Sequence, residues 1–154
     1  MLDVEVGTER RTGALVHECL DYLAVFHRWQ RTGGGYRSDI DDEDFCYITT
    51  TGRRSGNPHR IEIWFANEPG SRTIYVLAGG RERADFVRNA IAEPKVTVRI
   101  GDREGSATAR VVDAGTEEDA LARRLGLAKY QQPGRTDLES WGRSALPVAF
   151  DLHF

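Results

Sequence analysis

The chain of 154 residues, 40% of them hydrophobic and 29% charged, has the length and composition of one globular domain. None of its apolar runs approaches the roughly 20 residues that a membrane-spanning helix needs. The net charge of −3 divides unevenly, because residues 53–110 carry eleven Lys and Arg against seven Asp and Glu, whereas the remainder carries ten against seventeen. A basic middle in an acidic chain argues against general nucleic-acid binding and favours one discrete anionic ligand.

The N-terminal part is predicted to be a helix followed by a loop. Gly13–Trp29 places apolar residues at helical spacing, and the first eleven residues show acids where a signal peptide is positive, so we expect a cytoplasmic protein. Asp39–Asp44 is expected to be a solvated acidic loop, since it lacks the glycine and the distal glutamate of a calcium-binding loop. Residues 1–44 therefore precede a larger unit, residues 45–154, within one structural domain.

From residue 45 onward the hydrophobic period changes to two, which predicts strands. The predicted elements are, in order, strands Phe45–Thr51, Arg60–Asn67 and Thr73–Ala78, helix Arg83–Ala92, hairpin strands Lys95–Ile100 and Gly105–Asp113, helix Thr116–Tyr130, a polar loop, and strand Pro147–Phe154. This order indicates an α+β fold with an antiparallel barrel rather than a doubly wound sheet. Cys19 and Cys46 fall within apolar patterns and are expected to be buried thiols, and no metal site is expected.

Two predicted turns carry groups that bind anions. Thr49–Gly56 reads Thr-Thr-Thr-Gly-Arg-Arg-Ser-Gly, so that guanidiniums, a serine hydroxyl and backbone N–H groups can face a phosphate or a carboxylate. Leu77–Arg81 leads from a strand towards a helix, and Gly79 and Gly80 allow an anion to approach the backbone closely. Either turn alone is also compatible with an ordinary solvated connection. Two donor-rich turns after neighbouring strands nevertheless favour an anion site.

The same residues resemble the deazaflavin (coenzyme F420)-dependent nitroreductase and quinone reductase family, which is built on the split β-barrel of the FMN-binding flavoproteins. The resemblance covers most of residues 45–130 and rests on Thr49–Arg60, Gly79-Gly80, Asn89–Gly101 and Ala107–Val112. It implies a split-barrel homodimer that transfers a hydride from reduced F420 to a small-molecule acceptor, which would be a quinone, a nitroaromatic or an enone. No catalytic side chain is implied, because the cofactor carries the chemistry. FMN as the cofactor, and a non-catalytic flavin-, haem- or lipid-binding protein on the same fold, are the alternatives.

The resemblance also implies roles for individual residues. The residues expected to contact the coenzyme are Thr50, Thr51, Arg53, Arg54, Ser55, Gly56, Ala78, Gly79, Gly80, Arg81, Arg88 and Asn89. Tyr130 matches a region where the family places an aromatic residue near the substrate, and Trp64 is a second candidate, against a ring or in a dimer interface. The lysine that the family often has at the second turn is absent, which leaves Arg81 as its possible replacement. His59 and Trp141 are interpreted as an ordinary loop histidine and a packing residue.

Overall fold

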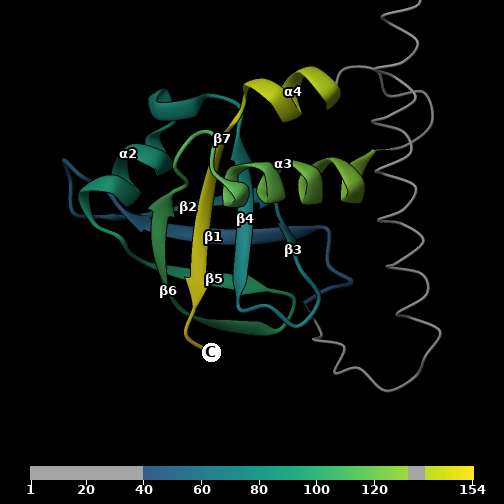
Figure 1. Ribbon diagram of the computed structural model, residues 1–154. Coiled ribbons are helices and arrows are strands. Elements are labelled where there is room, and N and C mark those ends of the chain that lie inside the picture. Colours follow the sequence, from purple (N-terminus) through teal and green to yellow (C-terminus); the bar gives the residue numbers. More distant parts are fainter. Residues whose placement is uncertain (1–39, 132–137) are drawn as a thin grey trace, which may run out of the picture. The chain divides into compact units, whose positions relative to one another are not determined.

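The computed structural model describes residues 40–131 and 138–154 (Figure 1), which lie within a compact unit spanning Arg37–Phe154. The predicted helix Gly13–Trp29 and the Cys19 thiol lie outside the described residues, and the division at residue 44 stays a prediction. Within the described ranges, no helix combines the length and the apolar character that crossing a membrane requires.

In the described part of the chain, seven strands form one antiparallel sheet. They are β1 (Phe45–Thr51), β2 (Pro58–Trp64), β3 (Ala66–Asn67), β4 (Thr73–Ala78), β5 (Lys95–Ile100), β6 (Arg103–Val111) and β7 (Leu146–Leu152). Their order across the sheet is β2-β1-β5-β6-β7-β4-β3, and every neighbouring pair is antiparallel. Residues that alternate along β1 and β5 are buried, as the period of two predicts, whereas β7 is buried along almost its whole length. The arrangement confirms the predicted α+β class with an antiparallel sheet.

Four helical segments accompany the sheet within the residues that the structure describes. They are the 3₁₀ turn η1 (Arg81–Arg83), α2 (Asp85–Ala92), α3 (Glu117–Tyr130) and α4 (Leu138–Ser144). The Thr116 side chain caps α3 by accepting the Asp119 N–H at 3.2 Å, in agreement with the predicted start of that helix. The core contains Phe86 and Val87 of α2 together with strand residues such as Ile48 and Phe150, and both strand residues are completely buried. Packing on this core fixes α2 relative to β1.

The predicted strand Arg60–Asn67 is wrong as a single element, because it begins at Pro58 and is interrupted at Phe65. The Tyr130 hydroxyl accepts the Phe65 N–H at 3.0 Å and lies 2.6 Å from the Phe65 carbonyl oxygen. Because this backbone is bonded to a side chain of α3, it leaves the strand ladder and β3 starts afresh at Ala66. The break is a tertiary effect that strand propensity does not contain.

Other boundaries also differ from the predictions: β6 ends at Val111 rather than Asp113, and β7 spans Leu146–Leu152 rather than Pro147–Phe154. The segment expected to be a polar loop before the last strand contains α4. Arg123 holds the C-terminal end of this helix, because the Arg123 Nη1 lies 2.9 Å from the carbonyl oxygens of Gly142, Arg143 and Ala145. The helix expected from Arg83 is divided by the extended Ala84 into η1 and α2. The predicted hairpin turn is shorter, since Ile100 pairs with Arg103 and only two residues, led by Gly101 at φ +57°, connect the strands.

Candidate functional site: the β1–β2 loop beside α2

The loop that joins β1 to β2 is a tight turn closed by its own backbone. The Gly52 N–H donates to the Asn57 carbonyl and the Gly56 N–H donates to the Gly52 carbonyl, both at 2.8 Å. Gly56 has φ +71°, a conformation that side chains rarely adopt. At Gly52, an added Cβ would lie 2.6 Å from the Ser55 Oγ and 3.1 Å from the Asn57 oxygen. Both glycines are therefore required by the shape of this loop.

Asn89 of α2 ties the loop to the core. Its side-chain oxygen accepts the Arg53 N–H at 3.1 Å and the Arg53 Nη1 at 3.0 Å, while its amide donates to the Thr50 hydroxyl at 3.2 Å. The Thr50 hydroxyl in turn donates to the His59 carbonyl at 3.4 Å. Asn89 and Thr50 are the buried polar side chains among the described residues, with 3% and 1% exposed. Because unpaired polar groups are costly to bury, this network holds the loop in one position.

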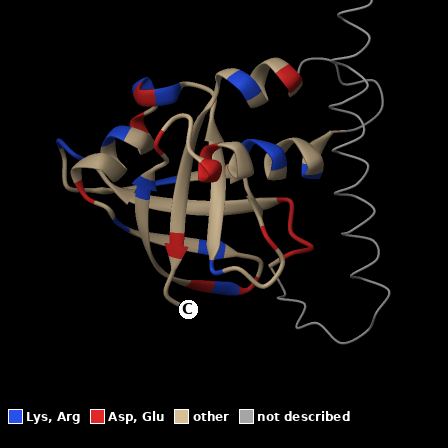
Figure 2. Cartoon of the chain, viewed as in Figure 1, with Lys and Arg blue, Asp and Glu red and all other residues tan. Residues whose placement is uncertain are grey.

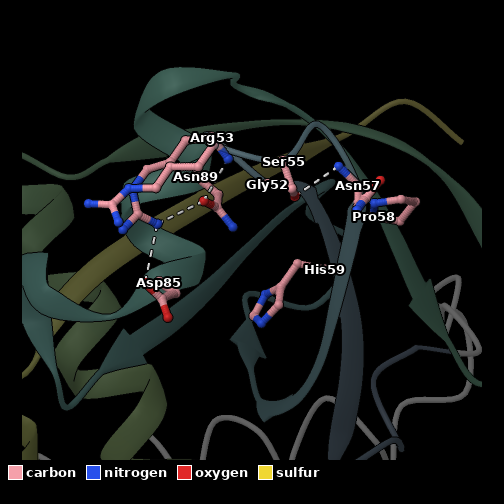
Figure 3. A pocket seen from close by; sticks show the side chains of 9 residues that line it. Gly52, Arg53, Ser55, Asn57, Pro58, His59, Asp85 and Asn89 are labelled. Atoms are coloured by element: carbon pink, nitrogen blue, oxygen red, sulfur yellow. Dashed lines mark hydrogen bonds and ion pairs between the residues drawn. The ribbon is translucent and has the colours of Figure 1, made fainter.

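A cavity of about 350 Å³ opens in front of this network (Figure 3). Its lining residues are Gly52, Arg53, Arg54, Ser55, Asn57, Pro58, His59, Asp85 and Asn89. The Arg53 guanidinium is shared between Asn89 and the Asp85 carboxylate, at 3.2 Å. The Arg54 guanidinium makes no hydrogen bond to another described residue and is exposed. The Ser55 hydroxyl accepts the Asn57 N–H at 3.1 Å and keeps its own proton for a ligand.

The donors of this cavity suit a phosphate or a carboxylate group. Figure 2 shows basic residues in the β1–β2 loop and in the adjacent η1 and α2. One guanidinium is fixed by Asn89 and the other is free, so an anion would meet a preorganised donor and an adaptable one. His59, expected in a loop, lies in β2 and lines the cavity. Asp85, which the sequence prediction missed, shows only the ordinary signal of an acid in the first turn of a helix.

The second predicted turn, Leu77–Arg81, does not line this cavity. Ala78 is buried at the end of β4, while Gly79 and Gly80 are exposed and do not line the cavity. Arg81 adopts the left-handed φ of +50°, and its Nη1 donates to the Ser144 carbonyl of α4 at 2.6 Å. Arg88 donates from its Nε to the Glu82 carbonyl at 3.0 Å. The two turns were expected to follow neighbouring strands, but β5, β6 and β7 lie between β1 and β4 in the sheet. Both arginines are engaged with backbone carbonyls.

Of the twelve residues predicted to contact the coenzyme, the structure brings four to the cavity. They are Arg53, Arg54, Ser55 and Asn89. Thr50 lies behind the cavity in the Asn89 network, whereas Thr51 pairs with Pro58 where the loop begins. The residues that do not line it are Thr50, Thr51, Gly56, Ala78, Gly79, Gly80, Arg81 and Arg88. The roles predicted for all twelve stay predictions.

The two predicted substrate residues stack on each other. The Trp64 and Tyr130 rings lie 4.5 Å apart with an interplanar angle of 6°, and Trp141 of α4 meets Trp64 edge-on at 6.0 Å. Tyr130 is buried, and burial raises the pKa of its hydroxyl. A Cβ added at Gly79 would lie 3.8 Å from the Trp141 Cδ1. The aromatic cluster of Trp64, Tyr130 and Trp141 thus adjoins the second turn and does not line the cavity beside Asn89.

A comparison with protein families finds a match that covers most of the chain. The model of the family described as F420H(2)-dependent quinone reductase matches residues 22–153. The matched region includes the loop, α2 and the aromatic cluster.

Solved structures share the fold at low sequence identity. An F420-H2 dependent reductase, FDR-A, is 24% identical, covers 70% of this chain and 92% of its own, and superposes with a TM-score of 0.55. The heme storage protein HutZ from Vibrio cholerae is 12% identical over 73% of this chain and 84% of its own, with a TM-score of 0.58. A protein described as a domain-swapped dimer is 23% identical over 85% and 97%, with a TM-score of 0.55. These likenesses confirm the predicted split β-barrel.

Proposed function

The chain belongs to the F420H2-dependent quinone reductase family, and from that premise we propose that it reduces a quinone, with nitroaromatics and enones as further acceptors. As a member of this family it is an oxidoreductase that uses coenzyme F420. The bound coenzyme supplies the hydride, so the protein has to bind, orient and shield the reactants. The acceptor and the contacts that follow belong to the proposal.

The observation that supports this function is the Asn89-anchored loop. We assign the anionic part of the coenzyme to the cavity, where Arg53 and Arg54 would donate charge-assisted hydrogen bonds and the Ser55 hydroxyl could add a third donor. The donor set fits such a group, because a phosphate offers several acceptor oxygens and the cavity offers two guanidiniums. Arg53 is already held by Asn89, so little side-chain entropy remains to be lost on binding.

The aromatic cluster is the proposed neighbour of the ring and the acceptor. Trp64 and Trp141 are half-buried, and the Trp141 ring lies beside Gly79, whereas the Tyr130 hydroxyl is bonded to backbone. Flat, apolar acceptors such as quinones bind well against such faces. In this proposal Tyr130 acts by supporting Trp64, because its ring is stacked and buried.

The test is a titration of the purified protein with F420 and with FMN, followed by oxidation of reduced F420 with menadione as the acceptor. We expect F420 binding and acceptor-dependent oxidation. Arg54→Ala should weaken F420 binding by roughly 1–3 kcal/mol, the usual worth of a hydrogen bond to a charged group. Arg124→Ala removes an exposed arginine of α3 that does not line the cavity and serves as the matched control. Binding of FMN alone, or equal F420 affinity in both variants, contradicts the proposal.

We also propose that the protein works as a cytoplasmic homodimer. A structural neighbour is described as a domain-swapped dimer, and Phe45 at the start of β1 leaves 43% of a large apolar side chain exposed. Light scattering on the purified chain should give twice the monomer mass of 17.3 kDa. A concentration-independent monomer mass contradicts this part of the proposal.

A further inference from the structure

Asp85 is a negatively charged residue in a cavity whose other charged groups would bind an anion. The Asp85 side chain keeps 66% of its surface exposed, whereas Arg53 keeps only 24%. One Asp85 oxygen pairs with the Arg53 Nη1 at 3.2 Å, and the other makes no hydrogen bond to a described residue. Figure 3 shows Asp85 and Arg53 linked at one side of the cavity. An anion bound by Arg53 would therefore meet a negative charge next to its own site.

The charges that line the cavity add up to a weak positive field. Arg53 and Arg54 contribute two positive charges and Asp85 one negative charge, which leaves +1 when His59 is counted as neutral. The attraction of such a field for an anion grows in proportion to the charge of the anion. The cost of removing the anion from water grows with the square of that charge. Reducing the field from +2 to +1 therefore penalises a dianion more than a monoanion.

We propose that Asp85 is a specificity-determining residue, which shifts the preference of the cavity away from a phosphomonoester dianion and towards a phosphodiester monoanion. The inference rests on the proposed function for the place where the coenzyme's anion binds. F420 carries its phosphate as a diester with one charge, whereas the FMN phosphate is a monoester that approaches two charges at neutral pH. Asp85 then helps the chain to discriminate between the two cofactors by charge, before any contact with their rings.

The test uses small phosphates so that no ring or tail contributes. Binding of dimethyl phosphate and methyl phosphate at pH 8 is measured from the NMR shifts of the loop and α2 backbone amides, in the wild type and in Asp85→Asn. We expect the variant to gain affinity for methyl phosphate about fivefold more than for dimethyl phosphate, which is the effect of one charge some 6 Å away in a mostly aqueous site. An unchanged ratio, or no binding of either probe to the wild type, overturns the inference.

A purely structural role of Asp85 is separated by a matched variant. Asp85 lies in the first turn of α2, where an acid stabilises a helix, and Glu117 lies in the first turn of α3 without lining the cavity. Glu117→Gln should lower Tm about as much as Asp85→Asn and leave the ratio of the two phosphates unchanged. If the ratio shifts in Asp85→Asn but reduced F420 is not oxidised, the proposed function fails and the inference stands. Tight F420 binding with an unaffected ratio overturns the inference alone.

Discussion

Replacing Asn89 with alanine tests whether the loop is held by one buried amide. The substitution removes three hydrogen bonds, two from Arg53 and one to Thr50, and leaves the Arg53 N–H and the Thr50 hydroxyl to find new partners. At a net worth of about 1 kcal/mol per bond, the free energy of unfolding should fall by about 2–3 kcal/mol. For a domain of this size, that lowers Tm by about 4–10 °C. Urea denaturation and calorimetry measure both quantities.

Two further variants separate stability from binding. Asn89→Asp keeps an acceptor for Arg53 but adds a negative charge to the cavity. The free energy of F420 binding should therefore fall by more than the free energy of unfolding does. Ile91→Ala changes an exposed residue of the same helix and should alter the free energy of unfolding by less than about 0.5 kcal/mol. The reasoning is refuted if Asn89→Ala is as stable as Ile91→Ala, since the network would then contribute nothing.

Three other features give predictions of their own. Burial lowers the pKa of Lys129 from 10.5 to about 8. Between these two pH values the unfolded chain binds more protons than the folded chain, so folding becomes more favourable as the pH rises. In urea denaturation, the free energy of unfolding of the wild type relative to that of Lys129→Met should therefore increase from pH 7.5 to 9.5. A difference that does not change with pH would contradict this. Burial raises the pKa of the Cys46 thiol to about 12, so in a Cys19→Ser variant at pH 8 the native protein should not react with a thiol reagent, whereas the urea-unfolded chain should. Arg123→Ala should cost about 2–3 kcal/mol, because three carbonyls at the end of α4 lose their donor; Arg123→Lys should not restore it, and tryptophan fluorescence should report the loosened helix.

Patterns confined to one element were readable from the sequence, and contacts between elements were not. β-Branched, aromatic and alternating apolar residues predicted β1, β4 and β5 with their observed bounds, and the capping threonine marked the start of α3. The strand break at Phe65 depends on a hydroxyl that lies 65 residues further along the chain. The helix α4 likewise depends on Arg123, which precedes it and donates to its final carbonyls. Neither side chain carries a local signal of this role.

The candidate site shows the same division. The Arg-Arg-Ser turn predicted hydrogen-bond donors for an anion, because guanidiniums are donors wherever they occur and glycines leave backbone N–H groups accessible. Asn89 and Asp85 line the cavity only because α2 packs against β1. An asparagine or an aspartate in a helix does not by itself indicate that it lies at a cavity.

The separation of the two turns limits the ligands that could use both. Gly80 caps η1, and η1 leads directly into α2, whose Asp85 and Asn89 line the anion cavity. A ligand held by Arg53 and also stacked near Gly79 would need an anionic group in one part and a planar ring in another. A compact anion would occupy the cavity alone and leave the aromatic cluster untouched. We therefore expect inorganic phosphate to perturb the loop but not the fluorescence of Trp64 and Trp141, and F420 to perturb both.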